Sequence, residues 1–332
     1  MSIENYLKSK KILIERELKE LISSFKDEFA KKSIFQPIKD FLFRGGKRWR
    51  AILSILTCQM VKGNWRNFKK LFLIPEVIHN GTLIIDDIED NSQLRRNKPA
   101  LHLEFGIDLS LNAGNFLYFL PFEILKKSKI PQEKKAKIYE LIFEKMLELH
   151  FGQGMDIFWH KNPQFVSEED YFKMARAKTG VLSSLAGKLG VILGDGSKSQ
   201  EKVVENFGKE LGVSFQIIDD ILNLFPKSLK WGKELGEDIT EGKLSLLIIK
   251  TLEAANLKDR NKLLFILRKH SNDPEIIKEA IELIKKYKAK EYAERKAREI
   301  LEKALIKLKL FFPQKGVKKL EEFSKFLIER KL

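Results

Sequence analysis

The chain has 332 residues, with 62 Lys and Arg against 46 Asp and Glu, so its formal charge is +16. An apolar fraction of 43% is enough for a large core, and the low content of Gly and Pro argues against collagen-like and turn-dense all-β proteins. The single Cys58 excludes a disulfide framework and a cysteine-based zinc site. Without an apolar run of about 18 residues or a signal-peptide core, we expect a cytoplasmic protein.

Helical periodicity runs through most of the chain. Apolar residues recur at intervals of three and four, and Gly, Pro and Asn separate the periodic stretches. In chain order, these stretches cover residues 4–29, 75–87, 137–152, 201–225 and 275–308. No convincing strand pattern, internal repeat or linker appears. The sequence therefore predicts an all-α protein, with one domain of ten or more helices over residues 1–332.

Two stretches, residues 75–87 and 214–225, are unusually apolar until each reaches a pair of aspartates. A helix that is apolar on all sides is normally buried. Both helices should therefore lie at the centre of a bundle and bring carboxylates into its interior.

These carboxylates indicate a metal site. Asp86 and Asp90 are one helical turn apart and share a face, with Asp87 beside them, and Asp219 and Asp220 form the second pair. Unpaired carboxylates on a buried face repel one another and are costly to desolvate, and a divalent cation removes both penalties. Oxygen ligands without His or Cys suit Mg²⁺, which often bridges to substrate phosphates.

Basic side chains accompany the aspartates and indicate an anionic substrate. Each basic signal alone is weak, because lysine is common in this chain. His79 lies two helical turns before Asp86, which favours substrate contact over a hydrogen-bonded core histidine. The candidate cations are Lys47, Arg48, Arg50, Arg95, Arg96, Lys178, Lys233 and Lys243.

Taken together, the motifs resemble the trans-isoprenyl diphosphate synthases, or polyprenyl synthetases, over nearly the whole chain. The motifs are GGKRWR, HNGTLIIDDIEDNSQLRR, GQGMD, KTG, FQIIDDILN and GKELGEDITEGK, in the order that the family has. The resemblance implies the isoprenoid synthase type I fold, in which helices surround a central cavity. It also implies head-to-tail condensation of isopentenyl diphosphate with an allylic diphosphate, and a homodimer.

The resemblance further implies a role for each matching residue. About three Mg²⁺ ions would bridge the allylic diphosphate to Asp86, Asp90 and Asp219, while Asp220 supports the third metal. Ionisation would give an allylic cation, which the double bond of isopentenyl diphosphate attacks before a proton is lost. The dipoles that would stabilise the cation are the carbonyl of Lys178, the hydroxyl of Thr179 and the amide of Gln216. The allylic diphosphate would contact Arg95, Lys178 and Lys233, and isopentenyl diphosphate would contact Lys47, Arg50, His79 and Arg96.

Two departures from the family pattern stand out. Asn223 ends the second cluster where the family usually has Asp, and we expect activity to be retained because the third metal relies chiefly on Asp219. Residues 113–115, Ala-Gly-Asn, replace the usual Gly-Asp. Gln153 and Asp156 match the family motif near the metal site.

The residues before Asp86 allow a prediction of product length. In the family, short-chain enzymes place aromatic rings four or five residues before the first aspartate, where this chain has Thr82 and Gly81. Ile78 lies one turn deeper. We therefore expect geranylgeranyl diphosphate or a longer product, and a shorter one from Gly81→Phe. A stripe of Phe116, Phe119 and Phe122 would either plug the cavity or belong to the core.

Three other functions remain as alternatives. A class I terpene cyclase shares the fold and the first aspartate motif, but it does not need the GGKRWR segment. A non-catalytic subunit of a heteromeric synthase would fit Asn223 but tends to lose the aspartates. A nucleic-acid-binding protein lacks support from any recognition motif. The ten basic and four acidic residues within 285–309 are typical of a solvated helix, and we expect at most peripheral membrane contact.

Overall fold

The computed structural model describes residues 2–226 and 236–329. Its first half contains α1 (Ile3–Ser23), α2 (Glu28–Ala30), η1 (Lys31–Phe35), α3 (Gln36–Phe43), α4 (Trp49–Met60), η2 (Trp65–Phe68), η3 (Leu71–Leu73), α5 (Ile74–Glu89), β1 (Leu94–Arg95), β2 (Lys98–Pro99), α6 (Leu101–Phe105), α7 (Ile107–Lys126) and α8 (Gln132–Lys161). Its second half contains α9 (Glu168–Ala175), η4 (Arg176–Gly180), α10 (Val181–Leu193), α11 (Lys198–Leu224), α12 (Glu237–Thr240), α13 (Leu246–Ala254), α14 (Leu257–Lys269), α15 (Pro274–Lys286), α16 (Ala289–Lys309) and α17 (Gln314–Ile328).

The all-α prediction is confirmed, with one small exception. A two-residue turn connects β1 and β2, which form an antiparallel hairpin. Both turn residues, Arg96 and Asn97, have positive φ values of 56° and 61°. This is the backbone conformation that a tight hairpin turn requires. Strands of two residues are too short to show an alternating pattern in the sequence.

The chain divides into two compact units. Unit 1 contains Met1–Lys145, Leu182–Gly208 and Lys307–Phe323, and unit 2 contains Met146–Val181, Lys209–Ile306 and Ser324–Leu332. Helices α8, α10, α11, α16 and α17 each contribute residues to both units. The two predicted aspartate clusters fall in different units, so each is described within its own unit.

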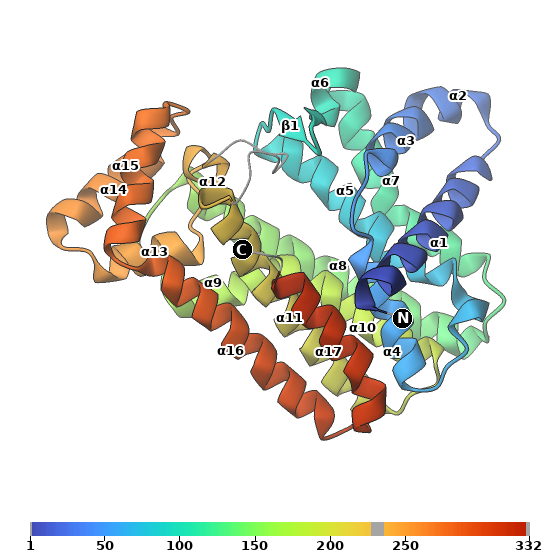
Figure 1. Cartoon of the computed structure of the whole chain (residues 1–332). Helices are drawn as coiled ribbons and strands as arrows, with labels where there is room; N and C mark the ends of the chain where they lie inside the picture. The colour runs from blue at the N-terminus through green and yellow to red at the C-terminus, as the bar shows by residue number, and fades with distance from the viewer. Residues whose placement is uncertain (1, 227–235, 330–332) are drawn as a thin grey trace. The chain divides into compact units, whose positions relative to one another are not determined.

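Unit 1 is built around α5, which packs extensively against α7 (Figure 1). Pro75 lies in the first turn of α5, where its missing N–H is tolerated. Glu76, which is 3% exposed, accepts hydrogen bonds from the backbone N–H groups of Arg50 (3.0 Å) and Ala51 (3.4 Å). This contact caps α4 at its N-terminus, where Arg48 provides no side-chain cap.

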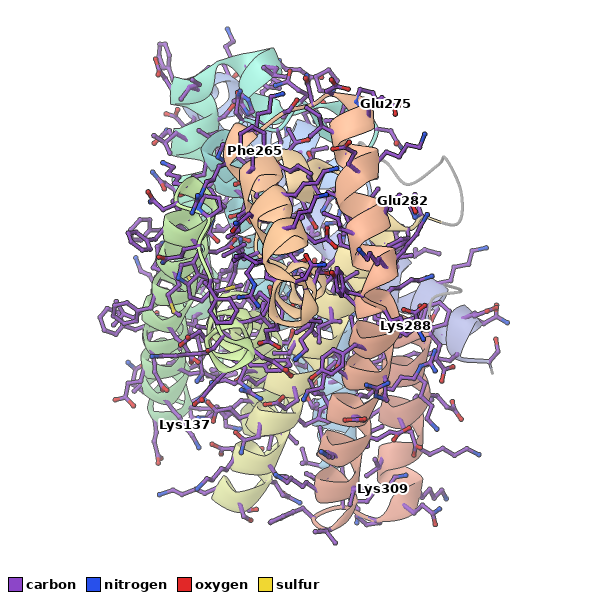
Figure 2. The ribbon with its side chains drawn as sticks, turned by 90° about the vertical axis from the view of Figure 1, so that its left-hand side faces the viewer. Lys137, Phe265, Glu275, Glu282, Lys288 and Lys309 are labelled. Carbon is purple, nitrogen blue, oxygen red and sulfur yellow. The ribbon has the colours of Figure 1, made fainter. Side chains whose placement is uncertain are left out.

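Unit 2 contains the paired helices α14 and α15, which pack against α12 and α13 (Figure 1). Asp273 accepts a hydrogen bond from the Glu275 N–H and so caps α15. Glu275 and Glu282 project from α15, and Phe265 projects from α14 (Figure 2). Over the described ranges of both units, no helix combines the length and apolarity needed to cross a bilayer.

Candidate active site

The carboxylates at the end of α5 point in two directions. Asp87 is fully buried and accepts hydrogen bonds from Nε (2.7 Å) and a terminal nitrogen of Arg95, which lies on β1. Asp86 and Asp90 lie one turn apart on a different, half-buried side of the helix end. Asp87 therefore has a structural role, whereas Asp86 and Asp90 remain accessible to a ligand.

Arg96, at the tip of the hairpin, turns back toward the centre of unit 1. It donates hydrogen bonds to the Phe41 carbonyl and to the Asn80 side chain, each at 3.2 Å. Its guanidinium also lies 5.2 Å from the centre of the Phe41 ring. Burial, and then the nearby charge of Arg48, lowers the pKa of Arg96 to about 10, so it remains charged at neutral pH.

His79 lies among four guanidinium groups. Burial, followed by the charges of Arg50, Arg96, Arg95 and Arg48, holds the pKa of His79 well below its ordinary value. The imidazole is therefore neutral at pH 7, and the positive charge around it comes from the arginine side chains. Such a cluster is an anion site that needs no metal.

Acid should destabilise the protein through His79. The unfolded chain binds a proton at His79 below about pH 6.5, whereas the folded chain does not, so stability is present above that pH and is lost below it. Between about pH 7.5 and pH 5.5 this group should contribute a loss of about 1.4 kcal/mol. Urea unfolding at the two pH values should show a smaller loss for His79→Gln, and equal losses in both proteins would contradict the prediction.

Sequence reasoning matched Arg50, Arg96 and His79 to the family's isopentenyl diphosphate ligands, and the structure brings them together. Arg48, another of the candidate cations, is 2% exposed, and its Nε and one terminal nitrogen have no hydrogen-bond partner among the described residues. Lys47 is exposed beside this cluster.

Unit 2 contains a hydrogen-bonded chain that ends on the second aspartate cluster. The Thr179 hydroxyl donates to Gln216 Oε1 (2.8 Å), and Gln216 Nε2 donates to Asp220 Oδ1 (2.6 Å). The Tyr171 hydroxyl donates to the other oxygen of Asp220 at 3.2 Å. Asp220 is buried and fixed, whereas its neighbour Asp219 is half-buried. Tyr171 gave no signal in the sequence, because it lies 49 residues from its partner.

Lys178 and Thr179 lie in η4, a turn of π-helix between α9 and α10. Such widened turns occur often at functional sites. Lys178 Nζ donates to Asp156 Oδ2 of α8 at 2.5 Å. A Cβ atom at Gly152 would lie 2.3 Å from the backbone nitrogen of Lys178, so only glycine allows α8 to approach η4 this closely.

Negative charge accumulates around Asp220. Burial, and then the charges of Asp238 and Asp219, raises the pKa of Asp220 to about 8. Asn223 accepts a hydrogen bond from the Asp238 N–H at 3.2 Å and so links Asp238 to α11. Asn223 Nδ2, in contrast, has no hydrogen-bond partner among the described residues. The amide oxygen thus provides a backbone contact without adding a further negative charge.

The remaining candidate cations give less information. Lys243, in the turn after α12, pairs with Glu241. Lys233 lies outside the described residues.

The three residues of α5 that were expected to set product length do not all face the same way. Thr82 is half-buried and lies one turn before Asp86 on the same side of α5. Gly81 faces α7 instead, where an added Cβ would lie 2.9 Å from the Gly114 carbonyl oxygen and 3.1 Å from Tyr118 Cδ1. Ile78 is fully buried. The small size of Gly81 therefore allows two helices to approach each other.

The aromatic stripe of α7 separates into distinct environments. Phe116 is half-buried and packs against Phe25 and Phe35, with ring centres 5.9 and 5.3 Å away. Phe122 stacks on Tyr139 of α8, and Phe119 is largely exposed.

Comparisons with known proteins agree with this geometry. The sequence profile of the polyprenyl synthetase family matches residues 31–284. A short chain isoprenyl diphosphate synthase of Methanothermobacter thermautotrophicus is 30% identical over 330 residues, with 99% of each chain covered. A geranylgeranyl pyrophosphate synthase of Geoglobus acetivorans is 31% identical over 328 residues, again with 99% of each chain covered.

A solved structure shows the same similarity in three dimensions. The geranylgeranyl pyrophosphate synthetase from Pyrococcus horikoshii has a TM-score of 0.90 and 32% identity to this chain, covering 99% of it and 98% of the other protein. The expected fold is therefore confirmed. Both aspartate pairs and the arginine cluster lie within the matched region, and we conclude that the chain belongs to the polyprenyl synthetase family and is a trans-prenyltransferase.

Proposed function

We propose that the enzyme condenses isopentenyl diphosphate with an allylic diphosphate and makes geranylgeranyl diphosphate or a longer product. The observation that supports this most directly is the pair of different anion sites along α5. Asp86 and Asp90 suit a metal-bound diphosphate, whereas His79 lies among four arginines that suit a metal-free one. Two diphosphates are what a condensation needs, and a cyclase binds only one.

The donors present fit magnesium. Over residues 2–226 and 236–329, no three acidic, histidine or cysteine side chains converge as a ready-made metal site. Mg²⁺ is commonly held by one or two carboxylates together with substrate phosphates and water, which matches the pairs on α5 and α11. We assign about three ions to Asp86, Asp90 and Asp219. When bound, they would neutralise the charge that develops on the leaving diphosphate.

Each unit has a part in the proposed reaction. In unit 1, Arg50, Arg96 and Arg48 bind and orient isopentenyl diphosphate, while the neutral His79 provides a hydrogen-bonding group without adding charge. In unit 2, Gln216 accepts a hydrogen bond from the Thr179 hydroxyl and donates a second one to Asp220, so it holds both side chains in place. The Thr179 oxygen and the Lys178 carbonyl are the dipoles that would stabilise the allylic cation.

The test is incubation of the purified protein with isopentenyl diphosphate, Mg²⁺ and each allylic diphosphate from five to twenty carbons. Chromatography of the dephosphorylated products should show chains of geranylgeranyl length or longer. Cyclic hydrocarbons formed without isopentenyl diphosphate would favour a cyclase. No turnover with any primer would favour a non-catalytic subunit.

We also propose a homodimer that forms through α7 and α8. Large apolar side chains project from both helices and lie in contact with solvent in the single chain, which is typical of an interface. On α8 they follow helical spacing and form a stripe. The residues are Leu111 and Phe119 on α7, and Phe143, Leu147, Phe151 and Phe158 on α8.

Phe143→Glu should therefore convert the protein to a monomer without unfolding the chain. Phe143 is 63% exposed in the isolated subunit, so its replacement leaves no cavity but places a charge in the interface. Phe265→Glu on α14 is a matched control, because Phe265 is 67% exposed. Sedimentation equilibrium should give a monomer for the first variant and a dimer for the second. If both variants are dimers, the interface lies elsewhere.

A further inference from the structure

The end of unit 1 at which α5 begins contains a cavity of about 1070 Å³. Its walls come from the segment before α5, the turn between α7 and α8, and the loop between α10 and α11. Leu71, which lines the cavity, lies just before the start of α5 at Ile74. Asp86 lies twelve residues after Ile74, or about 18 Å along the helix. The cavity is therefore separate from the diphosphate sites described above.

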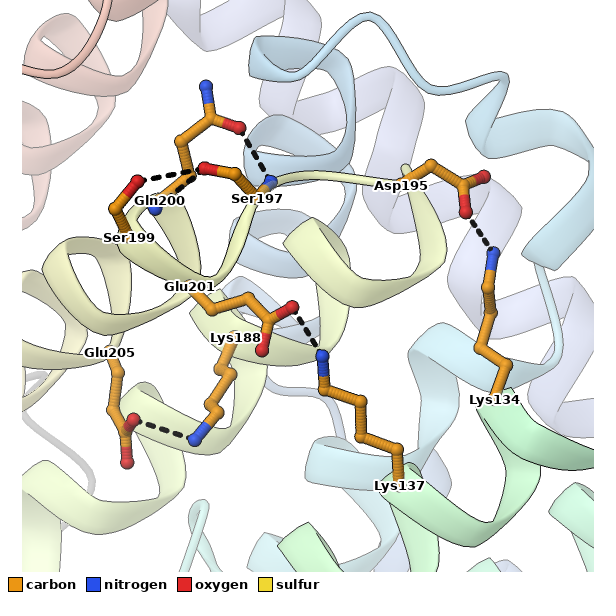
Figure 3. Close-up of polar contacts among 9 residues, drawn as sticks. All are labelled: Lys134, Lys137, Lys188, Asp195, Ser197, Ser199, Gln200, Glu201 and Glu205. Atoms are coloured by element: carbon orange, nitrogen blue, oxygen red, sulfur yellow. Dashed lines mark hydrogen bonds and ion pairs between the residues drawn. The ribbon is translucent and has the colours of Figure 1, made fainter.

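Two of the carboxylates that line the cavity are occupied by ion pairs. Lys134 pairs with Asp195 at 2.7 Å and Lys137 pairs with Glu201 at 2.5 Å, so that α8 is held against the α10–α11 loop and the first turn of α11 (Figure 3). These pairs fix the shape of the wall and contribute no net charge to it.

Other cations at the cavity are not neutralised in this way. Lys69, Lys70 and Lys129 line it and have no ion-pair partner within the described ranges. Arg66 lines it as well, 5.0 Å from the Trp65 ring. The lining carboxylates of Glu17 and Glu133 offset only part of this charge, and Glu17 also pairs with Arg16 at 3.4 Å, so the cavity attracts anions.

The positive surface continues from the cavity across unit 1. Lys10 of α1 lies 3.8 Å from the centre of the Trp65 ring, on which Arg66 also packs, and Lys319 of α17 lies over Tyr6. Burial, and then the charges of Arg66 and Lys319, lowers the pKa of Lys10. Cations from three separate elements therefore lie close enough to repel one another.

An apolar tip belongs to the same unit. Leu310 and Phe311, in the turn between α16 and α17, are 78% and 48% exposed. The exposed Lys307 and Lys309 precede them on α16. Lys309 and the cavity residue Lys137 both lie toward the lower end of the molecule in Figure 2. Exposed apolar side chains flanked by lysines are the combination that binds an anionic lipid surface.

We propose that this end of unit 1 docks on a bilayer containing anionic phospholipid, with a lipid phosphate entering the cavity beside Lys69, Lys70 and Lys129. A free phosphate or a nucleic acid would satisfy the lysines but would leave Leu310 and Phe311 in water. A bilayer accommodates both, because its headgroups attract the lysines and its acyl region accepts the apolar tip. Docking would also deliver a prenyl product to a lipid phase. This benefit rests on the proposed function, but the proposed binding to the bilayer is independent of it.

The experiment measures co-sedimentation of the full chain with vesicles, without substrates, so its outcome is independent of catalysis. The vesicles are phosphatidylcholine alone, or phosphatidylcholine mixed with phosphatidylglycerol. The protein should bind the mixed vesicles, and added salt should weaken the binding. Each basic residue near such a surface changes partitioning about fivefold, so Lys69→Glu/Lys70→Glu should reduce it on the order of 25-fold or more. Leu310→Ser should also reduce it.

The matched control is Lys258→Glu/Lys269→Glu, which reverses two exposed lysines on α14 in unit 2. It should bind mixed vesicles nearly as well as the parent protein. An equal loss in both double variants would mean that net charge alone drives binding, and would overturn the proposal. Absence of binding to mixed vesicles would also overturn the proposal. So would tight binding of polyphosphate or RNA that depends on Lys69 and Lys70, if the protein does not bind the vesicles. Unchanged circular dichroism would show that each variant is folded.

Discussion

Asp86→Ala should lower the rate of condensation by at least about a thousandfold, or ~4 kcal/mol of transition-state stabilisation. Asp86 and Asp90 are the accessible carboxylates of α5, and removing one leaves too few donors to hold a metal against the diphosphate. Because Asp86 is half-buried, the variant should remain folded, and its melting temperature should stay close to that of the parent protein.

Asp87→Ala should behave differently, although the two residues are adjacent. Asp87 is fully buried and pairs with Arg95, whose side chain is 14% exposed, so its removal takes a buried ion pair away from that guanidinium. A loss of about 3 kcal/mol or more in unfolding free energy is expected. Glu89→Gln removes an exposed carboxylate from the same helix and should change neither rate nor stability much. Near-normal turnover by Asp86→Ala would overturn the metal assignment.

Thr82→Phe should shift the product from geranylgeranyl length or longer to a shorter chain. Thr82 lies one turn before Asp86 on the same side of α5, so an aromatic ring there would meet the growing hydrocarbon close to the diphosphate. The Thr82 hydroxyl donates to the His79 carbonyl within the same helix, so its loss should have a small effect on stability. Thr82→Ser is the control and should keep the parent product distribution.

Gly81→Phe is a poorer test of product length than the sequence suggested. Its Cβ would already lie 2.9 Å from the Gly114 carbonyl oxygen, so the ring would push α7 away and cost about 3 kcal/mol of stability. Shorter products from Gly81→Phe would follow from that displacement as readily as from a blocked cavity. If Thr82→Phe gives unchanged products in a folded enzyme, the hydrocarbon does not pass that side of α5.

Features that depend on the spacing of nearby residues were predicted correctly from the sequence. The one-turn separation of Asp86 and Asp90 follows from helical periodicity, and both apolar helices are present. The bond between Thr179 and Gln216 joins two residues that the motifs had already selected. Assigning these features required only the repeat of the helix and the order of the motifs.

What the sequence did not predict depends on residues far apart in the chain. Glu76 caps α4 from 26 residues away, and Tyr171 reaches Asp220 across 49. The left-handed backbone of Arg48, with φ of 54°, also gave no signal in the sequence. Gly81 illustrates a further limit, because a small residue indicates either open space or a close neighbour, and only the packing shows which.

The π-helical turn at Arg176–Gly180 has a consequence for insertions and deletions. A widened turn accommodates one extra residue while the helices on either side keep their rotation about the axis. Loss of one residue there would therefore tighten the turn to an ordinary α-helix without twisting α9 against α10. The cost would fall on the reaction rather than on folding, since Lys178 and Thr179 would leave the positions that the widened turn gives them.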